Sequence, residues 1–275
     1  MLAPANSKRQ TLILRSFTWL STRLSRAVIT VSQCSKRDLT RVYGLPEAKI
    51  TVVYNGYDKA RFNPMAPDPQ LQKSLLAKLG IEKPYILHHG VIQPRKNLKR
   101  LIEAYRLMLS RRRSLDLDLV LAGPLGWNYA GVVASASDND GCGGRVILTG
   151  ALSDSDLSLL IKGASLAVIP SLYEGFCLPM VEAMACGIPT IASANSCLPE
   201  VSGNALRYFD PLSLEDMAGQ METAILDTEV REQLSRDGVK RAGIFSWERC
   251  ARETLEVLVA AIHQSRNAAA EPPEG

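Results

Sequence analysis

The sequence predicts an α/β fold built on a parallel sheet that helices cover on both faces. Short apolar runs alternate with amphipathic stretches along most of the 275 residues, which is the pattern of repeated βαβ units. Hydrophobic residues make up 46% of the chain, which supplies a sizeable core and excludes a disordered protein. At this length the chain holds one large domain or two modest ones.

The first seventy residues predict a short α/β segment followed by a linker. We expect strands at 27–31 and 50–54, with a helix over 36–43 between them. Three prolines then interrupt any regular pattern between Tyr57 and Pro69, which indicates a domain boundary.

Beyond the linker the alternation becomes regular. Five strands are expected, at 85–89, 117–122, 145–149, 165–169 and 188–192. The helix over 97–109 has the clearest helical period, and Asn97 occupies the position of its N-cap. Ser153 with Asp156 forms the start of another helix, in the manner of a capping box. The tail from 213 to 264 predicts consecutive helices, and the last residues are expected to fray.

Charge and cysteine usage restrict the function. A net charge of +4 permits an anionic ligand or a membrane surface but is too small to indicate nucleic acid as the main partner. Six cysteines without a CxxC motif predict reduced thiols. No apolar run reaches the roughly 20 residues of a membrane helix, and the N-terminal stretch lacks the pattern of a signal peptide. We expect a cytoplasmic protein, with peripheral attachment to the inner face of the membrane as an alternative.

Two strand-to-helix junctions contain the residue types of an anion site. In open α/β sheets ligands bind beyond the carboxyl ends of the strands, where helix N-termini offer free N–H groups. At the first junction Gly90 ends a strand without a side chain that could block a ligand, and Arg95 and Lys96 precede the next helix. A surface loop with two solvated cations explains this junction about equally well.

The second junction carries two carboxylates. Glu174 lies in the loop that follows the strand at 165–169, and Glu182 lies about one turn inside the next helix, between Pro179 and Gly187. Beside a diphosphate, such carboxylates can accept hydrogen bonds from the hydroxyls of a ribose or a hexose. An ordinary first-turn acid, favoured by the helix dipole, is the alternative for Glu182.

These junctions resemble a known enzyme family. Glu174 and Glu182 lie in a segment, PSLYEGFCLPMVEAMACGIPTIAS, that is similar to the E-x7-E region of glycosyltransferase family 4. The family's lysine-bearing loop, in the PRKN form of a mannosyltransferase-like subgroup, resembles GVIQPRKNLKRLIEAY, and its final helix resembles FSWERCARETLEVL. The resemblance covers nearly the whole chain, and its motifs are specific in combination.

The resemblance implies a GT-B architecture, in which two Rossmann-like domains face a cleft. Residues 1–60 would be the end of the acceptor-binding N-domain, 61–245 the nucleotide-sugar-binding domain, and 246–275 a crossover helix with a frayed tail. Residues 1–60 are too few for a complete N-domain. We therefore expect one of three explanations: an artificially shortened chain, a natural short gene product, or a half that a partner chain or another copy completes.

The resemblance also implies roles for individual residues. Lys96 would contact the donor diphosphate, Glu174 the hexose hydroxyls and Glu182 the ribose diol, with Lys96 and Glu174 as the catalytic residues. The base would lie near the strand end, and backbone N–H groups of the second loop would hold phosphate and sugar. Besides Glu182, the implied donor site consists of Gly90, Arg95, Ile147, Thr149, Gly175, Phe176, Cys177 and Leu178. A departing diphosphate gains negative charge, so fixed cations and helix dipoles suit this reaction without a metal.

Two positions depart from the family pattern. Val91 stands where many relatives carry an arginine, and Arg95 is expected to compensate for it. Cys177 replaces the glycine of the usual EGFGLP motif. If its φ is positive, the cysteine is strained by about 1 kcal/mol or more.

The resemblance leads to a retaining hexosyltransferase with a glycan or lipid-linked acceptor and no required metal. GDP-mannose is the first expectation for the donor, and UDP-glucose or a related UDP-sugar is the second. A donor-binding subunit that is inactive without a partner chain stays open as an alternative. A sugar-nucleotide epimerase of similar fold is a third possibility, against which the linked EGFCLP…E pattern argues.

Several other signals have simpler interpretations. Asp116 and Asp118 form a D-x-D pattern but are expected to be solvent-facing acids of a strand rather than a metal site. His88 and His89 are neighbours on a strand and therefore point to opposite faces, which does not suit a shared ion. The glycine cluster at 141–144 is expected to be a turn.

A basic stretch near the N-terminus has two interpretations. It runs from Lys8 to Arg26 and contains Phe17 and Trp19 among leucines. Contact with an anionic membrane explains this composition, and a core helix without its partners explains it about as well.

Overall fold

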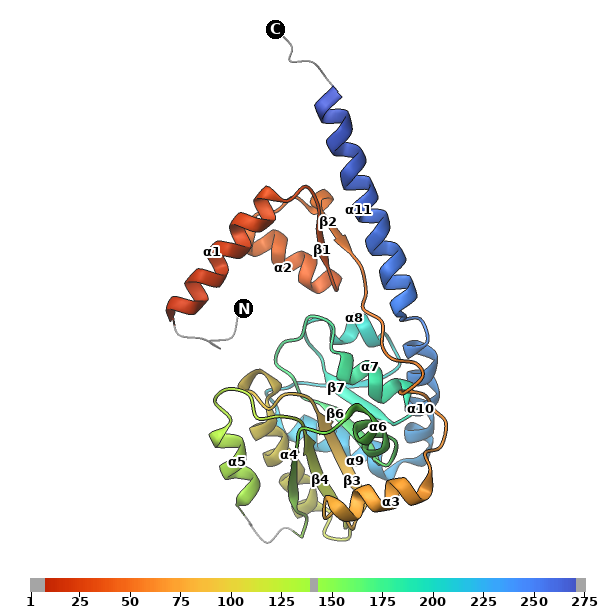
Figure 1. The fold of residues 1–275 in the computed structure, drawn as a ribbon. Helices are drawn as coiled ribbons and strands as arrows, with labels where there is room; N and C mark the ends of the chain where they lie inside the picture. The colour runs from red at the N-terminus through yellow and green to blue at the C-terminus, as the bar shows by residue number, and fades with distance from the viewer. Residues whose placement is uncertain (1–7, 139–142, 271–275) are drawn as a thin grey trace. The chain divides into compact units, whose positions relative to one another are not determined.

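The computed structural model describes residues 8–138 and 143–270, which form two compact units (Figure 1). The larger unit spans Tyr57–Ile244. The smaller unit combines the described residues up to Gly56 with those from Phe245 onward. The chain therefore leaves the smaller unit once and returns to it once.

Among the described residues, a six-stranded parallel sheet forms the centre of the larger unit. In sheet order its strands are β5 (Val146–Gly150), β4 (Asp118–Ala122), β3 (Tyr85–His89), β6 (Leu166–Ile169), β7 (Thr190–Ser193) and β8 (Arg207–Phe209). The chain adds β4 and β5 on one side of β3 and then crosses over to add β6, β7 and β8 on the other side. This is the order of a doubly wound, Rossmann-like sheet, in which ligands bind where the order reverses. Here that point lies between β3 and β6.

Helices cover both faces of this sheet. They are α3 (Pro69–Lys78), α4 (Leu98–Arg111), α5 (Ala130–Ser137), α6 (Asp154–Lys162), α7 (Leu178–Ala185), α8 (Leu198–Ser202), α9 (Leu214–Leu226) and α10 (Thr228–Ala242). Side chains of α4, α5 and α9 share one apolar cluster with the strands, and Figure 1 shows α6 on the opposite side. All five residues of β3 and of β4 are buried, as expected for strands covered on both faces.

The predicted elements of the larger unit are confirmed, with small shifts at their ends. The strands expected at 85–89 and 165–169 are β3 and β6. The helix expected over 97–109 is α4, whose apolar face, including Tyr105, is fully buried. Ser153 caps α6, because its Oγ accepts a hydrogen bond from the Asp156 N–H at 3.1 Å.

The smaller unit has a two-stranded parallel sheet and three α-helices among its described residues. Its elements are α1 (Lys8–Leu24), β1 (Val28–Thr30), α2 (Gln33–Tyr43), the 3-10 turn η1 (Glu47–Lys49), β2 (Ile50–Val52) and α11 (Trp247–Ala270). The helix expected over 36–43 begins three residues earlier because Ser32 caps it, its Oγ accepting from the Ser35 N–H at 3.0 Å. No helix in the described part of either unit has the length and apolarity to span a membrane.

Asn97 is the N-cap residue of α4, as predicted, but its side chain does not cap the helix. It stands at the N-cap position but with φ 59°, in the left-handed region, and makes no side-chain cap. Its Nδ2 instead donates to the Pro211 carbonyl oxygen at 2.8 Å. The tertiary contact therefore replaces the local one.

The prediction of two solvent-facing acids is correct for Asp116 and wrong for Asp118. The exposed Asp116 carboxylate pairs with Lys83 Nζ at 2.5 Å. Asp118 is fully buried, and its carboxylate accepts the Arg145 N–H at 3.0 Å and Arg145 Nη2 at 2.7 Å. A strand covered on both faces has no solvent side, so alternation along it does not expose every second residue.

Two further predictions concern the histidine pair and the glycine cluster. His88 and His89 contact different partners on different elements, as their opposite directions require. Of the glycine cluster, Gly141 and Cys142 lie outside the described residues, and Gly143 has φ 95°.

Candidate functional site

The site lies beyond the carboxyl ends of β3 and β6, where the loop after each strand leads into a helix. The first loop contains Gly90 and the 3-10 turn η2 (Pro94–Lys96) and enters α4. The second loop follows β6 and enters α7. The Leu172 N–H donates to the Arg95 carbonyl oxygen at 2.8 Å, which joins the two loops through their backbones.

Neighbouring loops hold the first loop in place. The Ile92 N–H donates to the Pro124 carbonyl oxygen at 2.9 Å, and Trp127 Nε1 donates to Gln93 Oε1 at 3.0 Å. A Cβ at Gly123 would lie 2.2 Å from the Gly90 carbonyl oxygen, so only glycine permits this approach. Arg95 and Lys96 therefore lie on a loop that backbone hydrogen bonds hold to the second loop and to the loop after β4.

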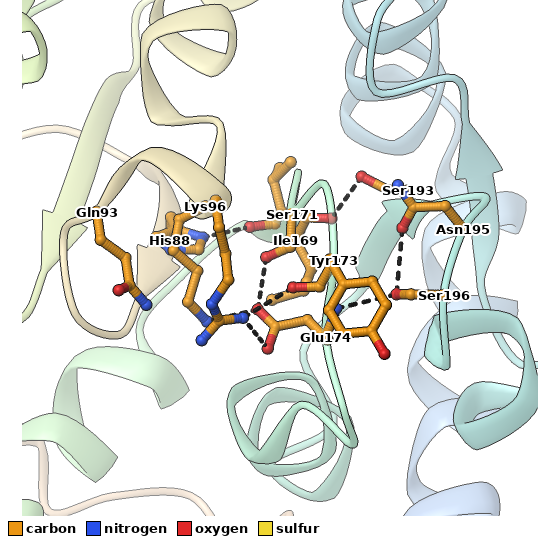
Figure 2. A network of polar contacts seen from close by, with 12 residues as sticks. His88, Gln93, Lys96, Ile169, Ser171, Tyr173, Glu174, Ser193, Asn195 and Ser196 are labelled. Carbon is orange, nitrogen blue, oxygen red and sulfur yellow. Dashed lines mark hydrogen bonds and ion pairs between the residues drawn. The ribbon is translucent and has the colours of Figure 1, made fainter. Parts of the chain in front are cut away.

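Glu174 lies between the two cations of the first loop. Its Oε1 accepts from Lys96 Nζ at 2.7 Å and from Ser171 Oγ at 2.8 Å. Its Oε2 pairs with Arg95 Nη1 at 2.5 Å, and the same Nη1 donates to the Tyr173 carbonyl oxygen at 2.8 Å. Figure 2 shows Lys96 and Glu174 pointing toward each other from their separate loops.

The charged side chains of Lys96 and Glu174 are buried, and that of Arg95 is partly buried. Lys96 and Glu174 are each only 5% exposed, and the Arg95 side chain is 32% exposed. Burial by itself opposes ionisation of Glu174, but Lys96 and Arg95 outweigh it, so the pKa of this carboxyl lies below its ordinary value. With Glu174 ionised, two cations and one anion leave one net positive charge.

The second loop ends at the N-terminus of α7. Cys177 is the N-cap residue and has φ 71° and ψ 69°, so the condition for strain at this non-glycine position is met. The thiol is buried, which together with nearby Glu174 raises the pKa of Cys177 to about 12. A protonated, buried thiol is a poor nucleophile. Pro179 has no N–H and the Met180 N–H donates to the Cys177 carbonyl oxygen at 3.1 Å, so the backbone N–H groups that precede Pro179 and the positive end of the helix dipole are what α7 offers to an anion.

Glu182, on α7, contacts a residue that the sequence did not indicate for the site. Its Oε2 lies 3.0 Å from Nε2 of His89, the last residue of β3. His89 is 2% exposed and the Glu182 side chain 18%. Nothing in the local pattern signalled this pair, because the two residues are separated by 93 positions in the chain.

His88 is the other buried imidazole at the end of β3. Its Nδ1 lies 3.0 Å from the Val168 carbonyl oxygen, and a carbonyl only accepts, so Nδ1 carries the hydrogen. Burial, with a further contribution from Lys96, lowers the pKa of His88 to about 3. The imidazole is therefore neutral at neutral pH.

Gly90 brings the two junctions together. It has φ 131°, and a Cβ built on it would lie 3.6 Å from Lys96 Nζ and 3.7 Å from Pro179 Cγ. The lysine amine, the first turn of α7 and the end of β3 thus meet around one glycine. An anion placed here would face a cation, a helix N-terminus and backbone without a side chain.

The structure gathers most of the predicted site residues but separates two of them. Gly90, Arg95, Lys96, Glu174 and the residues that begin α7 lie on the two joined loops. Ile147 and Thr149 lie in β5, which β4 separates from β3, and Thr149 Oγ1 donates to the Gly150 carbonyl oxygen at 2.9 Å. Ser171 and His89 were missed by the sequence reasoning. Among the described residues, no group of three or more His, Cys, Asp or Glu side chains is arranged to hold a metal ion.

Two family models match the chain. Residues 72–241 match the model described as Glycosyl transferases group 1, and residues 2–61 match the model described as Glycosyltransferase Family 4. The first match covers most of the larger unit, including both junctions of the site.

Curated relatives include mannosyltransferases. The chain is 33% identical to O-antigen chain mannosyltransferase B of Escherichia coli over 233 residues, which is 84% of this chain and 60% of that protein. It is 30% identical over 271 residues to MMP alpha-(1->4)-mannosyltransferase of Mycolicibacterium hassiacum, covering 95% of this chain and 62% of that protein. The chain thus spans less than two thirds of the length of these relatives.

Solved structures share the fold. The Anabaena protein Alr3699/HepE, crystallised with UDP and glucose, superposes with a TM-score of 0.78 at 22% identity, over 90% of this chain and 66% of that one. A sucrose-phosphate synthase from Thermosynechococcus elongatus gives a TM-score of 0.74 at 22% identity, over 96% of this chain and 65% of that one. These likenesses confirm the predicted fold class, a Rossmann-like GT-B C-terminal domain with part of an N-terminal domain.

Proposed function

The chain belongs to the group 1 glycosyl transferases, and from this membership we propose that it transfers a hexose from a nucleotide sugar to a glycan or lipid-linked acceptor, with retention of anomeric configuration. The observation that carries the proposal is the cluster of Lys96, Arg95 and Glu174 beside the N-terminus of α7. That cluster keeps a net positive charge beside Gly90, whose missing side chain leaves backbone next to Lys96 and Pro179.

The chemistry of this reaction requires stabilisation of the leaving group. When the anomeric bond breaks, the departing nucleoside diphosphate gains negative charge. Lys96 Nζ carries three hydrogens, and Glu174 accepts one of them. The other two can be donated to phosphate oxygens. Together with the dipole of α7, Lys96 would replace the metal ion that other transferases use. Removing one such group typically costs about 100- to 1000-fold in rate.

The two acids would hold the sugars of the donor. We assign Glu174 to the hexose hydroxyls and Glu182 to the ribose diol, with the backbone N–H groups of Gly175, Phe176, Cys177 and Leu178 near phosphate and hexose. Ile147 and Thr149 would hold the base through backbone atoms. We propose that the acceptor attacks from the face that the diphosphate leaves, within a short-lived ion pair. A covalent route through Glu174 is less favoured, because both of its oxygens are held by Lys96, Ser171 and Arg95.

For the donor we propose GDP-mannose, and a UDP-sugar as the second choice. The names of the curated relatives support mannose, because both proteins cited above are called mannosyltransferases. A thermal-shift panel of GDP-, UDP- and ADP-sugars tests the choice. A saturating donor at about 100 times its Kd adds about 2.7 kcal/mol of stability, which shifts the unfolding temperature measurably.

The same panel on variants tests the site. Lys96→Ala and Glu182→Ala should each lose most of the donor-dependent shift. Lys99→Ala is the matched control, because Lys99 lies on the first turn of α4 with its side chain 66% exposed. No shift with any donor, or equal shifts in all variants, would exclude the assignment. Addition of EDTA should leave the shift unchanged if no metal is required.

A donor-binding subunit that depends on a partner chain is the second candidate. In the described part of the smaller unit, β1 and β2 form the whole sheet, with three residues each, and isolated two-stranded sheets are marginal in water. Purified chain with labelled donor separates the two candidates. Transfer or donor hydrolysis supports the enzyme, whereas saturable binding without turnover supports the subunit.

Peripheral attachment to a membrane stays a prediction. The helix α1 exposes Leu12, Phe17 and Leu24, each at least 66% exposed, near basic residues such as Arg23. Co-sedimentation with anionic vesicles, compared with neutral ones, is the measurement, and equal recovery from both would contradict the prediction.

A further inference from the structure

We propose that His89 is a positioning residue, which fixes the Glu182 carboxylate so that one of its oxygens faces the ribose of a bound nucleotide. The expected consequence is selectivity for ribonucleotides over nucleotides without the ribose diol. This inference rests on the proposed function, because it assumes that a nucleotide binds beside Glu182.

The geometry of the pair supports a fixed orientation. His89 is the last residue of β3 and Glu182 lies on α7, so strand and helix meet through this contact at the point where the strand order reverses. The distance of 3.0 Å between His89 Nε2 and Glu182 Oε2 is that of a hydrogen bond. A carboxylate only accepts, so Nε2 is the donor.

The second oxygen of Glu182 is the one available to a ligand. The side chain is 18% exposed, and within the residues that the structure describes its only hydrogen bond is the one from His89 to Oε2. Oε1 therefore keeps its capacity to accept. Because one oxygen is held from the strand, the carboxylate cannot rotate freely about its last torsion, and Oε1 points in a defined direction.

The polar contacts of His89 favour a role at this site over simple packing. Its ring is 2% exposed, yet Nδ1 has no hydrogen-bond partner among the residues that the structure describes. A buried polar atom without a partner is unfavourable, and an apolar side chain in the same place would avoid it. Within the described part of the chain, the hydrogen bond to Glu182 is therefore the one favourable contact that His89 makes here and that an apolar side chain could not make.

The adjacent residue shows that burial at this strand end does not by itself produce such a contact. His88 is equally buried, but its Nδ1 bonds a backbone carbonyl of β6 and reaches no acid. Only the ring of His89 reaches α7.

The experiment compares binding of GDP and 2′,3′-dideoxy-GDP, and of UDP and its dideoxy analogue, by calorimetry. The variants are His89→Phe, which removes the donor, and His89→Gln, whose amide nitrogen reaches about as far as Nε2. His263→Gln, an exposed histidine of α11, is the matched control. We expect wild type and control to prefer the ribonucleotide by about tenfold or more, as for a hydrogen bond to a charged group. In His89→Phe the preference should fall below about threefold, and His89→Gln should restore most of it.

A double-mutant cycle adds a readout that a merely structural role would not change. Glu182→Ala should abolish the preference, and His89→Phe combined with it should cause no further loss. If His89→Phe fails to fold, His89→Gln and His89→Asn carry the test. The shorter asparagine should lose the preference that glutamine keeps.

The outcomes separate the two hypotheses. Folded His89→Phe, or His89→Asn, with the full wild-type preference overturns the role of His89 and leaves the proposed function intact. A wild-type chain that binds neither nucleotide pair overturns the nucleotide site itself. A wild-type chain that binds the ribo and dideoxy forms equally overturns the contact of Glu182 with the ribose diol, and with it the role of His89.

Discussion

Replacing Glu174 by glutamine should destabilise the protein more than replacing the lysine that it pairs with. Glu174→Gln removes the counter-charge of Lys96, whose side chain is 6% exposed, and leaves that cation buried without a partner. Breaking a buried pair in this way typically costs about 3–5 kcal/mol. The Arg95 guanidinium is 32% exposed, so solvent compensates most of its loss.

Lys96→Met should cost less, because Glu174 is not left alone. Its Oε2 keeps Arg95 Nη1 at 2.5 Å, and its Oε1 keeps Ser171 Oγ at 2.8 Å. We expect about 1.5–3 kcal/mol, the range for losing one hydrogen bond to a charged group. The prediction is therefore an asymmetry between the two halves of one ion pair.

Urea unfolding of the two variants measures this asymmetry, with Lys99→Met as the control. Lys99 is 66% exposed and 4.0 Å from Glu103, so its loss should change the free energy of unfolding by less than about 0.5 kcal/mol. A double variant, Lys96→Met with Glu174→Gln, should be more stable than Glu174→Gln alone. If Glu174→Gln costs no more than Lys96→Met, or no more than the control, the assignment of a buried, paired lysine is refuted.

Three further predictions concern the surroundings of the site. The pKa of His88 lies near 3 in the folded chain and near 6.5 in the unfolded chain, so the unfolded chain takes up the proton first. The free energy of unfolding should therefore fall by about 1.4 kcal/mol per pH unit as pH decreases from about 6.5 to 3. His88→Asn should flatten this slope in urea unfolding at successive pH values, and an unchanged slope would contradict the assignment. Cys177→Gly should stabilise the fold by about 1 kcal/mol, because glycine adopts φ 71° without strain, and an increase in the urea midpoint at constant slope checks it. Asp118→Asn should lower the free energy of unfolding by about 2–3 kcal/mol, since it weakens three hydrogen bonds from Arg145 at a fully buried position. A loss within about 0.5 kcal/mol, the effect of an ordinary surface change, would show that the carboxylate contributes little.

Local sequence patterns predicted the class of fold and five strands of the larger sheet, but not the short strand β8 (Arg207–Phe209). Apolar runs such as 85–89 and the helical period of 97–109 are local patterns, so they can be recognised without knowing what the segments pack against. The same holds for the residue types at the two junctions and for their family resemblance. The side chain of Ser153 caps α6, as its position in the sequence predicts, whereas the side chain of Asn97 does not cap α4.

Which of those residues contact one another depends on the arrangement of the strands in the sheet. Lys96 and Glu174 are 78 positions apart, and His89 and Glu182 are 93 apart. Their pairing depends on β6 lying beside β3, because sheet order, not periodicity, brings the ends of two distant strands together. Periodicity also could not show that both faces of β4 are covered, and for that reason the burial of Asp118 appeared only when the layers were in place.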